Sequence, residues 1–330
     1  MMKKYKLLIV GCGELGSRHL QAVSSLPEVN DVHIVDPKPE ALKLGQSRLT
    51  EISDLNRNIK FSWSSEFNKS SSAGDLCVVA TQAKGRCALI KEISKNLEYN
   101  EFLIEKIVSQ SVEEYKSLMS FCETNNLSVW VNCKERAYGI HKYIKSRLNP
   151  NESIVFTILG GNHGLANNGI HAVDLFSYYD EGKQINNMYS RIDSTLHPSK
   201  RGKDIFDLSG VLYGRSEKGC DFMLNFAGNH ESPGIITIIS PSRRFIVDHF
   251  RKFAYENYAE TDWQWNKIPI DEDWNVSHMS KKFVWDILTK NSCDLPTLKE
   301  CYPAHDFILN TTLPYFNQLL GTDNNYCPVT

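Results

Sequence analysis

A glycine-rich turn near the start of the chain restricts its fold more than any other feature. Gly11-Cys12-Gly13-Glu14-Leu15-Gly16 follows an apolar run typical of a buried strand, 6–10, and precedes a stretch with helical spacing, 14–25. In this setting the first glycine allows a tight turn, the second lets a pyrophosphate approach the backbone, and the third lets helix and strand pack closely. The helix N-terminus adds free N–H groups and a partial positive charge. The whole turn, Glu14 and Leu15 included, is therefore predicted to bind a dinucleotide.

An acidic residue follows the turn at the distance that dinucleotide-binding folds require. Asp36 ends the next apolar strand, about 20 residues after Gly16, where a carboxylate would accept hydrogen bonds from the adenosine ribose. Asp36 favours NAD(H), because its charge would repel a 2′-phosphate, while the nearby Lys38 leaves NADP(H) open. Two other interpretations of the glycines are a methyltransferase-type loop and a turn that only packs.

The pattern of apolar residues changes near residue 150, after a turn signal at 149–151. Before it, strands alternate with helical stretches, which predicts a parallel sheet covered on both faces. After it, one helical stretch at 170–179 is followed by a run of strands, which predicts an open, mostly antiparallel sheet. We therefore predict an α/β Rossmann domain, 1–135, and an α+β domain, 136–330.

The expected elements can be placed along the sequence. Strands of the first domain are expected at 6–10, 32–35, 59–63, 75–80, 101–104 and 127–131, and its helices at 14–25, 40–48, 85–96 and 112–125. Strands of the second domain are expected at 154–159, 187–195, 207–213, 221–227, 234–239 and 244–248. Two helices, 276–289 and 298–319, are expected to close the chain, with Pro303 and Pro314 breaking or kinking the second.

Composition excludes several other classes of protein. Lys and Arg number 37 against 39 Asp and Glu, and the resulting net charge of −2 disfavours a dedicated nucleic-acid binder. No apolar run approaches the ~20 residues of a membrane-spanning helix, and the first apolar stretch is shorter than a secretory signal. The nine cysteines include no Cys-x-x-Cys pair, so neither a disulfide framework nor a zinc site is predicted. We expect a cytoplasmic protein with no nucleic-acid, membrane or metal partner.

Three motifs in this order resemble the glucose–fructose oxidoreductase and inositol dehydrogenase (Gfo/Idh/MocA) family. They are the glycine turn with its continuation Ser17-Arg18-His19, the pair Glu105-Lys106, and Gly169-Ile170-His171-Ala172-Val173-Asp174. The resemblance covers most of the chain and is strongest in 5–136 and 154–176. It implies a Rossmann domain followed by an α+β domain, and oxidation or reduction of a sugar, polyol or sugar-nucleotide hydroxyl with NAD(P). A softer similarity at 295–297 implies a role in bacterial surface-glycan biosynthesis.

The Glu105-Lys106 pair follows a parallel strand at the sheet edge where open α/β sheets bind ligands. The family pattern is Glu-Lys-Pro, and the resemblance implies that Lys106 reaches the reacting oxygen beside the nicotinamide and that Glu105 lies at the cofactor. In this chain Ile107 replaces the proline. The alternative is an ordinary surface Glu-Lys pair.

The second motif with chemistry runs from a glycine-rich strand end into a helix. His171 and Asp174 are three residues apart and would share a helix face, and His171 can carry a proton near neutral pH. The family's first acid is Asn167 here, and an amide can orient a hydroxyl but cannot take its proton. The predicted substrate contacts in this region are Asn167, His171, Asp174 and His163, the last of which lies beside glycines that allow close approach. The alternative for His171 is a core histidine satisfied by Asp174.

Four further residues follow strands of the first domain. The resemblance implies that Thr81 lines the nicotinamide ribose and that Asn132 and Arg136 line the substrate pocket. Arg86 stands where the family often has histidine, and we expect it to contact an anion or to cap its helix. Arg136 would suit a carboxylate or phosphate, and its alternative is a salt bridge at the domain boundary.

These features predict an NAD(P)-dependent oxidoreductase with Lys106 and His171 as catalytic residues. A catalytically inactive nucleotide sensor or scaffold on the same fold is the main alternative, motivated by Asn167 and Ile107. An enzyme that retains its cofactor and transfers hydride between two sugars is a third possibility. Because an exposed sheet face usually needs cover, we also expect a homodimer or homotetramer.

Overall fold

The computed structural model describes residues 3–330, which divide into two compact units. The first contains the described residues up to Ser109, together with Glu113–Asn132 and Asp273–Lys299. The second contains Gln110–Val112, Cys133–Glu272 and Glu300–Thr330. The sequence suggested two consecutive segments divided after residue 135, whereas here the segment Asp273–Lys299 returns to the first unit.

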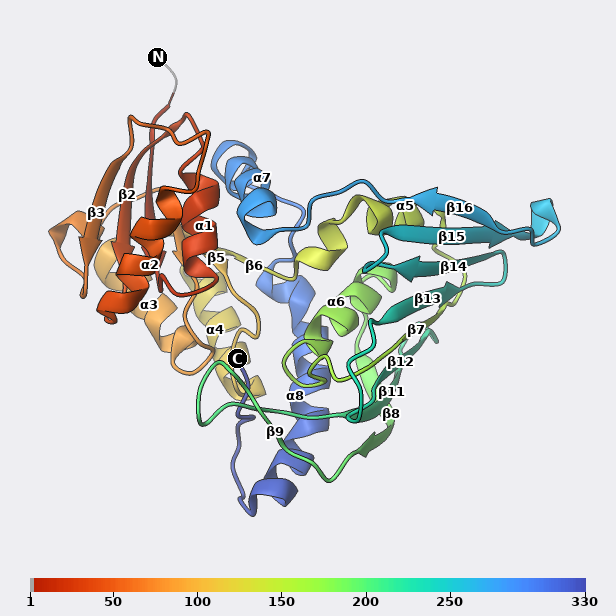
Figure 1. Cartoon of the computed structure of the whole chain (residues 1–330). Helices are drawn as coiled ribbons and strands as arrows, with labels where there is room; N and C mark the ends of the chain where they lie inside the picture. Colours follow the sequence, from red (N-terminus) through yellow and green to blue (C-terminus); the bar gives the residue numbers. More distant parts are fainter. Residues whose placement is uncertain (1–2) are drawn as a thin grey trace. The chain divides into compact units, whose positions relative to one another are not determined.

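The first unit has the predicted Rossmann architecture. Its six-stranded sheet has the order β3-β2-β1-β4-β5-β6, and every pairing is parallel. The central strands β1 and β4 are short apolar runs whose side chains are buried, whereas the edge strand β3 is exposed or half-buried. Helices lie on both faces of the sheet (Figure 1). They are β1 (Tyr5–Val10), β2 (Val29–Val35), β3 (Lys60–Ser64), β4 (Leu76–Val79), β5 (Glu101–Ile104) and β6 (Ser128–Val131).

The helices of the first unit connect these strands, except for the last one. They are α1 (Gly16–Val23), α2 (Pro39–Leu49), α3 (Arg86–Leu97), α4 (Val112–Thr124) and α7 (Val276–Lys290). Helix α1 packs against both α2 and α7. Since the strand order reverses between β1 and β4, the carboxyl ends of these strands form the crevice where such sheets bind ligands.

The second unit contains an eight-stranded sheet with the order β16-β15-β14-β13-β7-β12-β11-β8. Only β7 and β12 pair in parallel, so the prediction of a mostly antiparallel sheet is confirmed. The strands are β7 (Val155–Gly160), β8 (Ile185–Ile192), β11 (Gly210–Ser216), β12 (Asp221–Phe226), β13 (Ile235–Ile239), β14 (Arg243–Asp248), β15 (Phe253–Tyr258) and β16 (Asn266–Pro269). Two short strands, β9 (His197–Pro198) and β10 (Phe206–Asp207), pair separately.

Helices α5 (Gly139–Arg147), α6 (Gly169–Tyr179) and α8 (Leu298–Leu320) accompany this sheet. Phe156 of β7 and Phe222 of β12 stack at 5.9 Å between ring centres, and Phe176 of α6 and Phe307 of α8 contact Phe222. This aromatic cluster forms the core between one face of the sheet and the helices. None of the helices in the described chain has both the length and the apolar composition needed to cross a membrane.

The prediction that Pro303 and Pro314 break or kink the last helix is wrong as to a break, and a kink stays a prediction. Helix α8 is continuous through Pro303 and Pro314. Ala304, Phe307 and Ile308 are buried between these prolines, so the burial of its apolar face outweighs the two lost backbone hydrogen bonds.

Candidate active site

The glycine turn has the geometry that its sequence predicts. Gly11 adopts a φ of 85°, and a Cβ there would lie 2.9 Å from the carbonyl oxygen of Ala80. A Cβ on Gly16 would lie only 1.8 Å from the carbonyl oxygen of Gly11, so only glycine allows helix and turn to meet. A Cβ on Gly13 would meet nothing within 4 Å. Space is therefore open at the one glycine whose predicted role is to let a pyrophosphate approach the backbone.

Asp36 is buried at the end of β2 and fastens this strand to the turn. Its carboxylate accepts hydrogen bonds from the backbone N–H groups of Cys12, at 2.7 Å, and Lys38, at 2.8 Å. A carboxylate offers about four acceptor positions, so both oxygens retain capacity for a ribose hydroxyl. The adenosine-binding role of Asp36 stays a prediction that this geometry supports.

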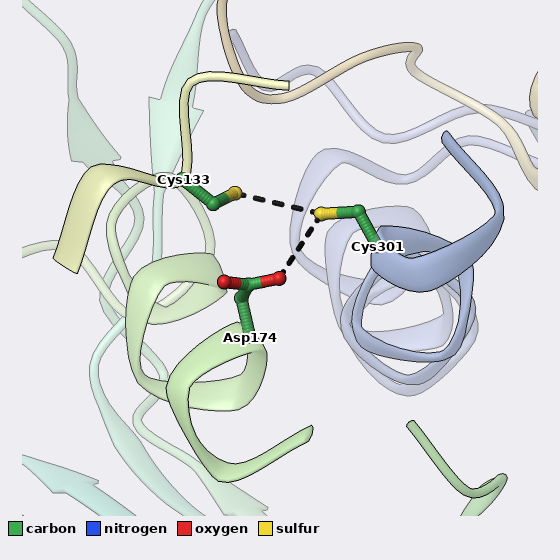
Figure 2. Close-up of side chains that lie close together, drawn as sticks. All are labelled: Cys133, Asp174 and Cys301. Carbon is green, nitrogen blue, oxygen red and sulfur yellow. Dashed lines mark hydrogen bonds between the residues drawn. The ribbon is translucent and has the colours of Figure 1, made fainter. Parts of the chain in front are cut away.

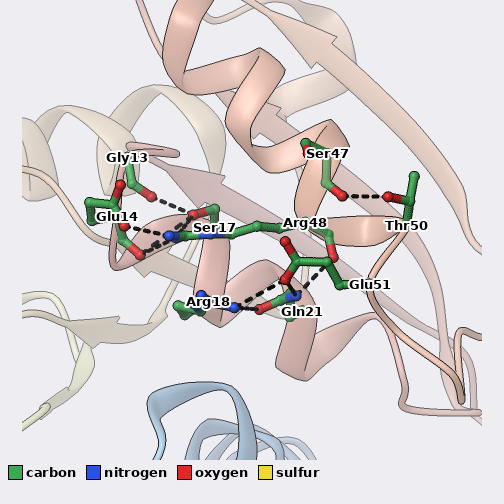
Figure 3. Close-up of polar contacts among 9 residues, drawn as sticks. All are labelled: Gly13, Glu14, Ser17, Arg18, Gln21, Ser47, Arg48, Thr50 and Glu51. Carbon is green, nitrogen blue, oxygen red and sulfur yellow. Dashed lines mark hydrogen bonds and ion pairs between the residues drawn. The ribbon is translucent and has the colours of Figure 1, made fainter.

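A buried arginine that the sequence reasoning missed anchors the start of α1 (Figure 3). Arg48 of α2 donates to the backbone oxygen of Glu14, at 2.6 Å, to the hydroxyl of Ser17, at 2.5 Å, and to the Glu14 carboxylate. Ser17 in turn donates to the backbone oxygen of Gly13 at 2.6 Å. Arg48 therefore fixes the segment that would hold the phosphates, through contacts that no local motif could indicate.

The pair that follows β5 is not an ordinary surface pair, because Glu105 and Lys106 are both buried. One oxygen of Glu105 is 2.8 Å from Nε2 of His19 and accepts a hydrogen bond from the amide of Asn132 at 2.7 Å. Nδ1 of His19 lies 2.9 Å from the hydroxyl of Ser280 in α7. The chain of contacts joins β6, β5, α1 and α7 within the first unit. The predicted cofactor contact of Glu105 and substrate contact of Asn132 stay predictions.

The charge of Glu105 is stabilised by its partners. Burial raises the pKa of this carboxyl, but the hydrogen bond and charge of His19, the hydrogen bond from Asn132 and the charge of Lys106 outweigh it and lower the pKa to about 2. Glu105 is therefore a carboxylate throughout the neutral range. The peptide bond between Lys106 and Ile107 is cis.

Two residues of the β4–α3 connection lie beside this pair. Arg86 begins α3, and its guanidinium donates to the backbone oxygens of Thr81, Glu105 and Ile107. Its terminal nitrogens thus bind backbone oxygens outside α3 rather than capping this helix, and the expected contact with an anion stays a prediction. The hydroxyl of Thr81 is buried and makes no hydrogen bond in the described structure, which leaves it available to the predicted nicotinamide ribose.

In the second unit His171 and His163 line the same cavity. The cavity has a volume of about 530 Å³ and lies against α6, β7, β12 and β13. Its wall also contains Glu135, Glu231 and His249, none of which the sequence singled out. They occur as single residues in the η2 turn (Lys134–Ala137) and in loops, without a spacing that would mark them.

Asp174 is the partner of Arg136, not of His171. Two nitrogens of Arg136 contact the Asp174 carboxylate at 2.5 and 2.8 Å, and both side chains are buried. Burial would lower the pKa of Arg136, but the charge of Asp174 raises it, so the guanidinium stays charged. The expected salt bridge of Arg136 is thus present, and it lies within the second unit. The predicted substrate contacts of both residues stay predictions.

Two thiols complete the surroundings of Asp174 (Figure 2). The sulfur of Cys301 lies 3.3 Å from Asp174 and 3.5 Å from the sulfur of Cys133. The three candidate ligand atoms lie within 4.8 Å of one another. Because burial raises the pKa of the Cys301 thiol, Cys301 lies as a neutral thiol beside the ion pair of Arg136 and Asp174.

Asn167, at the position of the family's acid, is held by other parts of the chain. Its amide donates to the Asp207 carboxylate at 2.9 Å and to the backbone oxygen of Phe206 at 2.7 Å, and its oxygen accepts from the backbone of Thr330 at 2.8 Å. His163 contacts the backbone oxygen of Ser232 at 2.8 Å through Nε2. The predicted roles of Asn167 and His163 toward substrate stay predictions.

Two imidazoles contact each other at the cavity wall: His249, which is half-buried and lines the cavity, and His141, which is buried behind it. Nε2 of His249 lies 2.8 Å from Nε2 of His141, whose Nδ1 lies 2.6 Å from the hydroxyl of Tyr179. Burial lowers the pKa of His249 to about 4, with smaller opposing effects of Asp248 and Glu272. Burial and the neighbouring His249 also lower the pKa of His141. Both imidazoles are therefore neutral at neutral pH.

This pair predicts a loss of stability in mild acid. The unfolded chain takes up protons on His141 and His249 below their ordinary pKa of 6.5, whereas the folded protein keeps His249 neutral down to about pH 4. The free energy of unfolding should therefore decrease as the pH falls through this range. Urea unfolding of the wild type and of His249→Gln should show a shallower decrease in the variant, and identical slopes would contradict the assignment.

The fold and the glycine turn together define a two-domain protein of the Rossmann type with an α+β second domain. No model of a protein family matches the sequence, and no curated protein matches it. Solved structures do match. One is the UDP-N-acetylglucosamine 3-dehydrogenase GnnA from Acidithiobacillus ferrooxidans, at 13% identity over 94% of this chain and 97% of that chain, with a TM-score of 0.72.

Two further solved structures are similar over nearly their whole length. Levoglucosan dehydrogenase in complex with NADH and levoglucosan is 14% identical over 94% of this chain and 98% of that chain, with a TM-score of 0.71. The 3-ketoreductase KijD10 from Actinomadura kijaniata in complex with NADP and TDP-benzene is 11% identical over 93% of this chain and 96% of that chain, with a TM-score of 0.68. The chain thus has the fold of these oxidoreductases, and the fold that the family resemblance implied is confirmed.

Proposed function

We propose that this protein is an NAD(P)-dependent oxidoreductase that acts on a hydroxyl or keto carbon of a sugar-type substrate. One observation carries the proposal: a glycine turn with open space at Gly13 and a buried Lys106 follow strands of the same parallel sheet. Carboxyl ends of neighbouring parallel strands are where such sheets bind ligands. The fold shared with solved sugar and sugar-nucleotide oxidoreductases supports this function.

The residues of the first unit fit a dinucleotide. The N–H groups at the start of α1 would bind the pyrophosphate, Asp36 the adenosine ribose, and Thr81 the nicotinamide ribose. Asp36 favours NAD(H) over NADP(H), because its carboxylate, which accepts from the backbone of Cys12 and Lys38, would repel a 2′-phosphate. Similar structures were solved with NADH and with NADP. On the basis of Asp36 we propose NAD(H) as the preferred cofactor and NADP(H) as the alternative.

Bound nicotinamide would supply the hydride acceptor or donor. Lys106 would stabilise the charge that develops on the reacting oxygen, and a buried ammonium does so more effectively than an exposed one. His171, in the wall of the cavity, would exchange the hydroxyl proton with solvent. We propose these two residues as the catalytic pair.

The cavity favours a substrate whose sugar part is uncharged. Among the described residues that line it none is Lys or Arg, while Glu135 and Glu231 contribute carboxylates suited to sugar hydroxyls and Phe226 an apolar surface. We expect a neutral sugar to react with a KM about tenfold lower than that of its phosphate ester, given ~1 kcal/mol per exposed like-charge contact. Glu231→Gln should narrow this difference, and an unchanged ratio of the two KM values would contradict the role of Glu231.

Exposed apolar side chains on the second sheet support the proposal of a homodimer or homotetramer. They include Val155 and Leu159 of β7, Met188 and Tyr189 of β8, and Ile239 of β13. Such a face is usually covered by a partner. A light-scattering mass of one chain at micromolar concentration would contradict it. The predicted role in surface-glycan biosynthesis and the cytoplasmic location stay predictions.

The function can be tested by following NADH absorbance with a panel of sugars, polyols and sugar nucleotides. We expect oxidation or reduction of at least one compound, and tight NADH binding measured by calorimetry. The alternative of a nucleotide sensor or scaffold predicts NADH binding without turnover of any compound. Asn167 motivates this alternative, because the residue at the position of the family's acid is engaged by Asp207 and Thr330.

A further inference from the structure

Arg86 is a fully buried arginine, and the proposed chemistry does not use its charge. We infer that Arg86 is a positioning residue for Lys106, an inference that rests on the proposed function. The guanidinium holds the backbone on both sides of Lys106 and thereby fixes where its ammonium group can reach.

The contacts of Arg86 bracket the lysine. One nitrogen, Nη1, donates to the backbone oxygen of Glu105 at 2.5 Å and also to that of Ile107. The other, Nη2, donates to the backbone oxygen of Thr81. The residue before Lys106 and the residue after it are therefore tied to one planar group. The same group joins them to the connection that follows β4.

Only an arginine can make this set of contacts. Arg86 is 1% exposed, and burying a charge is expensive unless its donors are satisfied. A guanidinium presents five N–H donors in a rigid plane and can span several carbonyl oxygens, whereas a lysine ammonium is a single point on a flexible stem. We attribute the buried charge of Arg86, despite its desolvation cost, to the defined backbone geometry that its hydrogen bonds hold.

A second set of contacts fixes the same segment independently. The side chain of Glu105 is held by His19 and Asn132, as described above. Arg86 binds the main chain, so the two sets constrain different atoms of one short segment. Two of the departures from the family pattern, Ile107 for proline and Arg86 for histidine, fall within this cluster. Arg86 thus secures by hydrogen bonds a backbone that lacks the proline ring.

The consequence for catalysis is one of placement. Arg86 holds the residues before and after Lys106, which fixes the position of the Lys106 Cα. The ammonium group can therefore occupy fewer positions. A displacement of about 1 Å in a reacting group can lower a rate by roughly 100-fold. Loss of Arg86 should therefore lower turnover.

The test compares Arg86→Ala with the wild type in the NADH-coupled reaction. We expect kcat to fall roughly 10- to 100-fold, with the KM for the sugar and the Kd for NADH changed only a few-fold. Guanidinium ion at low millimolar concentration should restore part of the activity of Arg86→Ala by occupying the vacated site. It should not restore Lys106→Met, which lacks the ammonium group itself.

Two further variants keep the test decisive. Arg86→Lys retains a buried charge and should fold even where Arg86→Ala does not, yet we expect a lowered kcat because one ammonium cannot bracket Lys106. Arg48→Ala, the other buried arginine of this unit, should instead raise the Kd for NADH. A folded Arg86→Lys or Arg86→Ala with wild-type kcat would overturn the inference. A wild type that binds NADH but turns over no compound would overturn the proposed function instead.

Discussion

Replacing Lys106 by methionine should lower turnover by roughly two to four orders of magnitude, the range typical of an acid–base or charge-stabilising group. Methionine has a similar length and suits a buried position, but it carries no charge. Because the glycine turn and Asp36 hold the predicted cofactor site, the Kd for NADH should change only a few-fold. Steady-state kinetics and calorimetric titration with NADH measure the two quantities separately.

A matched lysine controls for the loss of a positive charge in the same unit. Lys281 of α7 is exposed and pairs with Asp54 at 2.9 Å. Lys281→Met should leave both kcat and NADH binding close to the wild type, since exposed ion pairs contribute little. Turnover of Lys106→Met equal to that of Lys281→Met would remove Lys106 from the mechanism.

The largest expected effect on stability comes from Arg136→Met. This change leaves the Asp174 carboxylate buried, 1% exposed and without its guanidinium partner. Breaking one side of a buried ion pair typically costs about 3–5 kcal/mol in the free energy of unfolding. Urea unfolding followed by circular dichroism should show this loss as a lower midpoint.

Two comparisons identify the cause of that loss. The double variant Arg136→Met with Asp174→Asn removes both charges and should recover part of the stability. Arg215→Met breaks a surface pair with Asp221 and should lower the midpoint far less than Arg136→Met does. Equal losses in Arg136→Met and Arg215→Met would contradict the buried-pair account.

The first unit could be predicted well from sequence because its signals are local. Gly11 adopts a positive φ, Gly16 packs against the carbonyl oxygen of Gly11, and Gly13 leaves open space, so the turn can be read from six residues of sequence. The alternation of short apolar strands with helices indicates a parallel sheet. Asp36 could be placed for the same reason, since it ends the strand after the turn. The candidate residues for the pyrophosphate and the adenosine ribose belong to this local pattern.

Elements that bury polar side chains were missed. Helix α5 buries His141 beside Ile140 and Ile144, so it lacks the apolar stripe that marks a helix. Strand β15 buries Glu256, whose charge is satisfied by Arg243 at 3.0 Å from the neighbouring strand β14. Polar residues become suited to burial only through such partners, which appear in the fold and not in the pattern.

The parts of the candidate site that could not be predicted depend on contacts between residues far apart in the sequence. Arg86 and Arg48 act on backbone atoms of other segments, and Ser280 reaches His19 from a helix more than half the chain away. Asp174 was expected beside His171 by helical spacing, yet Arg136 pairs with it from the η2 turn. Helical spacing indicates which residues share a face, but it does not indicate what packs against that face.

The central claim is that the bound dinucleotide exchanges a hydride with a sugar carbon under the control of Lys106. Transfer of deuterium from C4-deuterated NADH to a keto sugar, followed by mass spectrometry of the product, tests it most directly. We predict deuterium on one sugar carbon with the wild type and a rate lower by roughly two to four orders of magnitude with Lys106→Met. Tight binding of NADH with no deuterium reaching any compound of the panel would contradict the account.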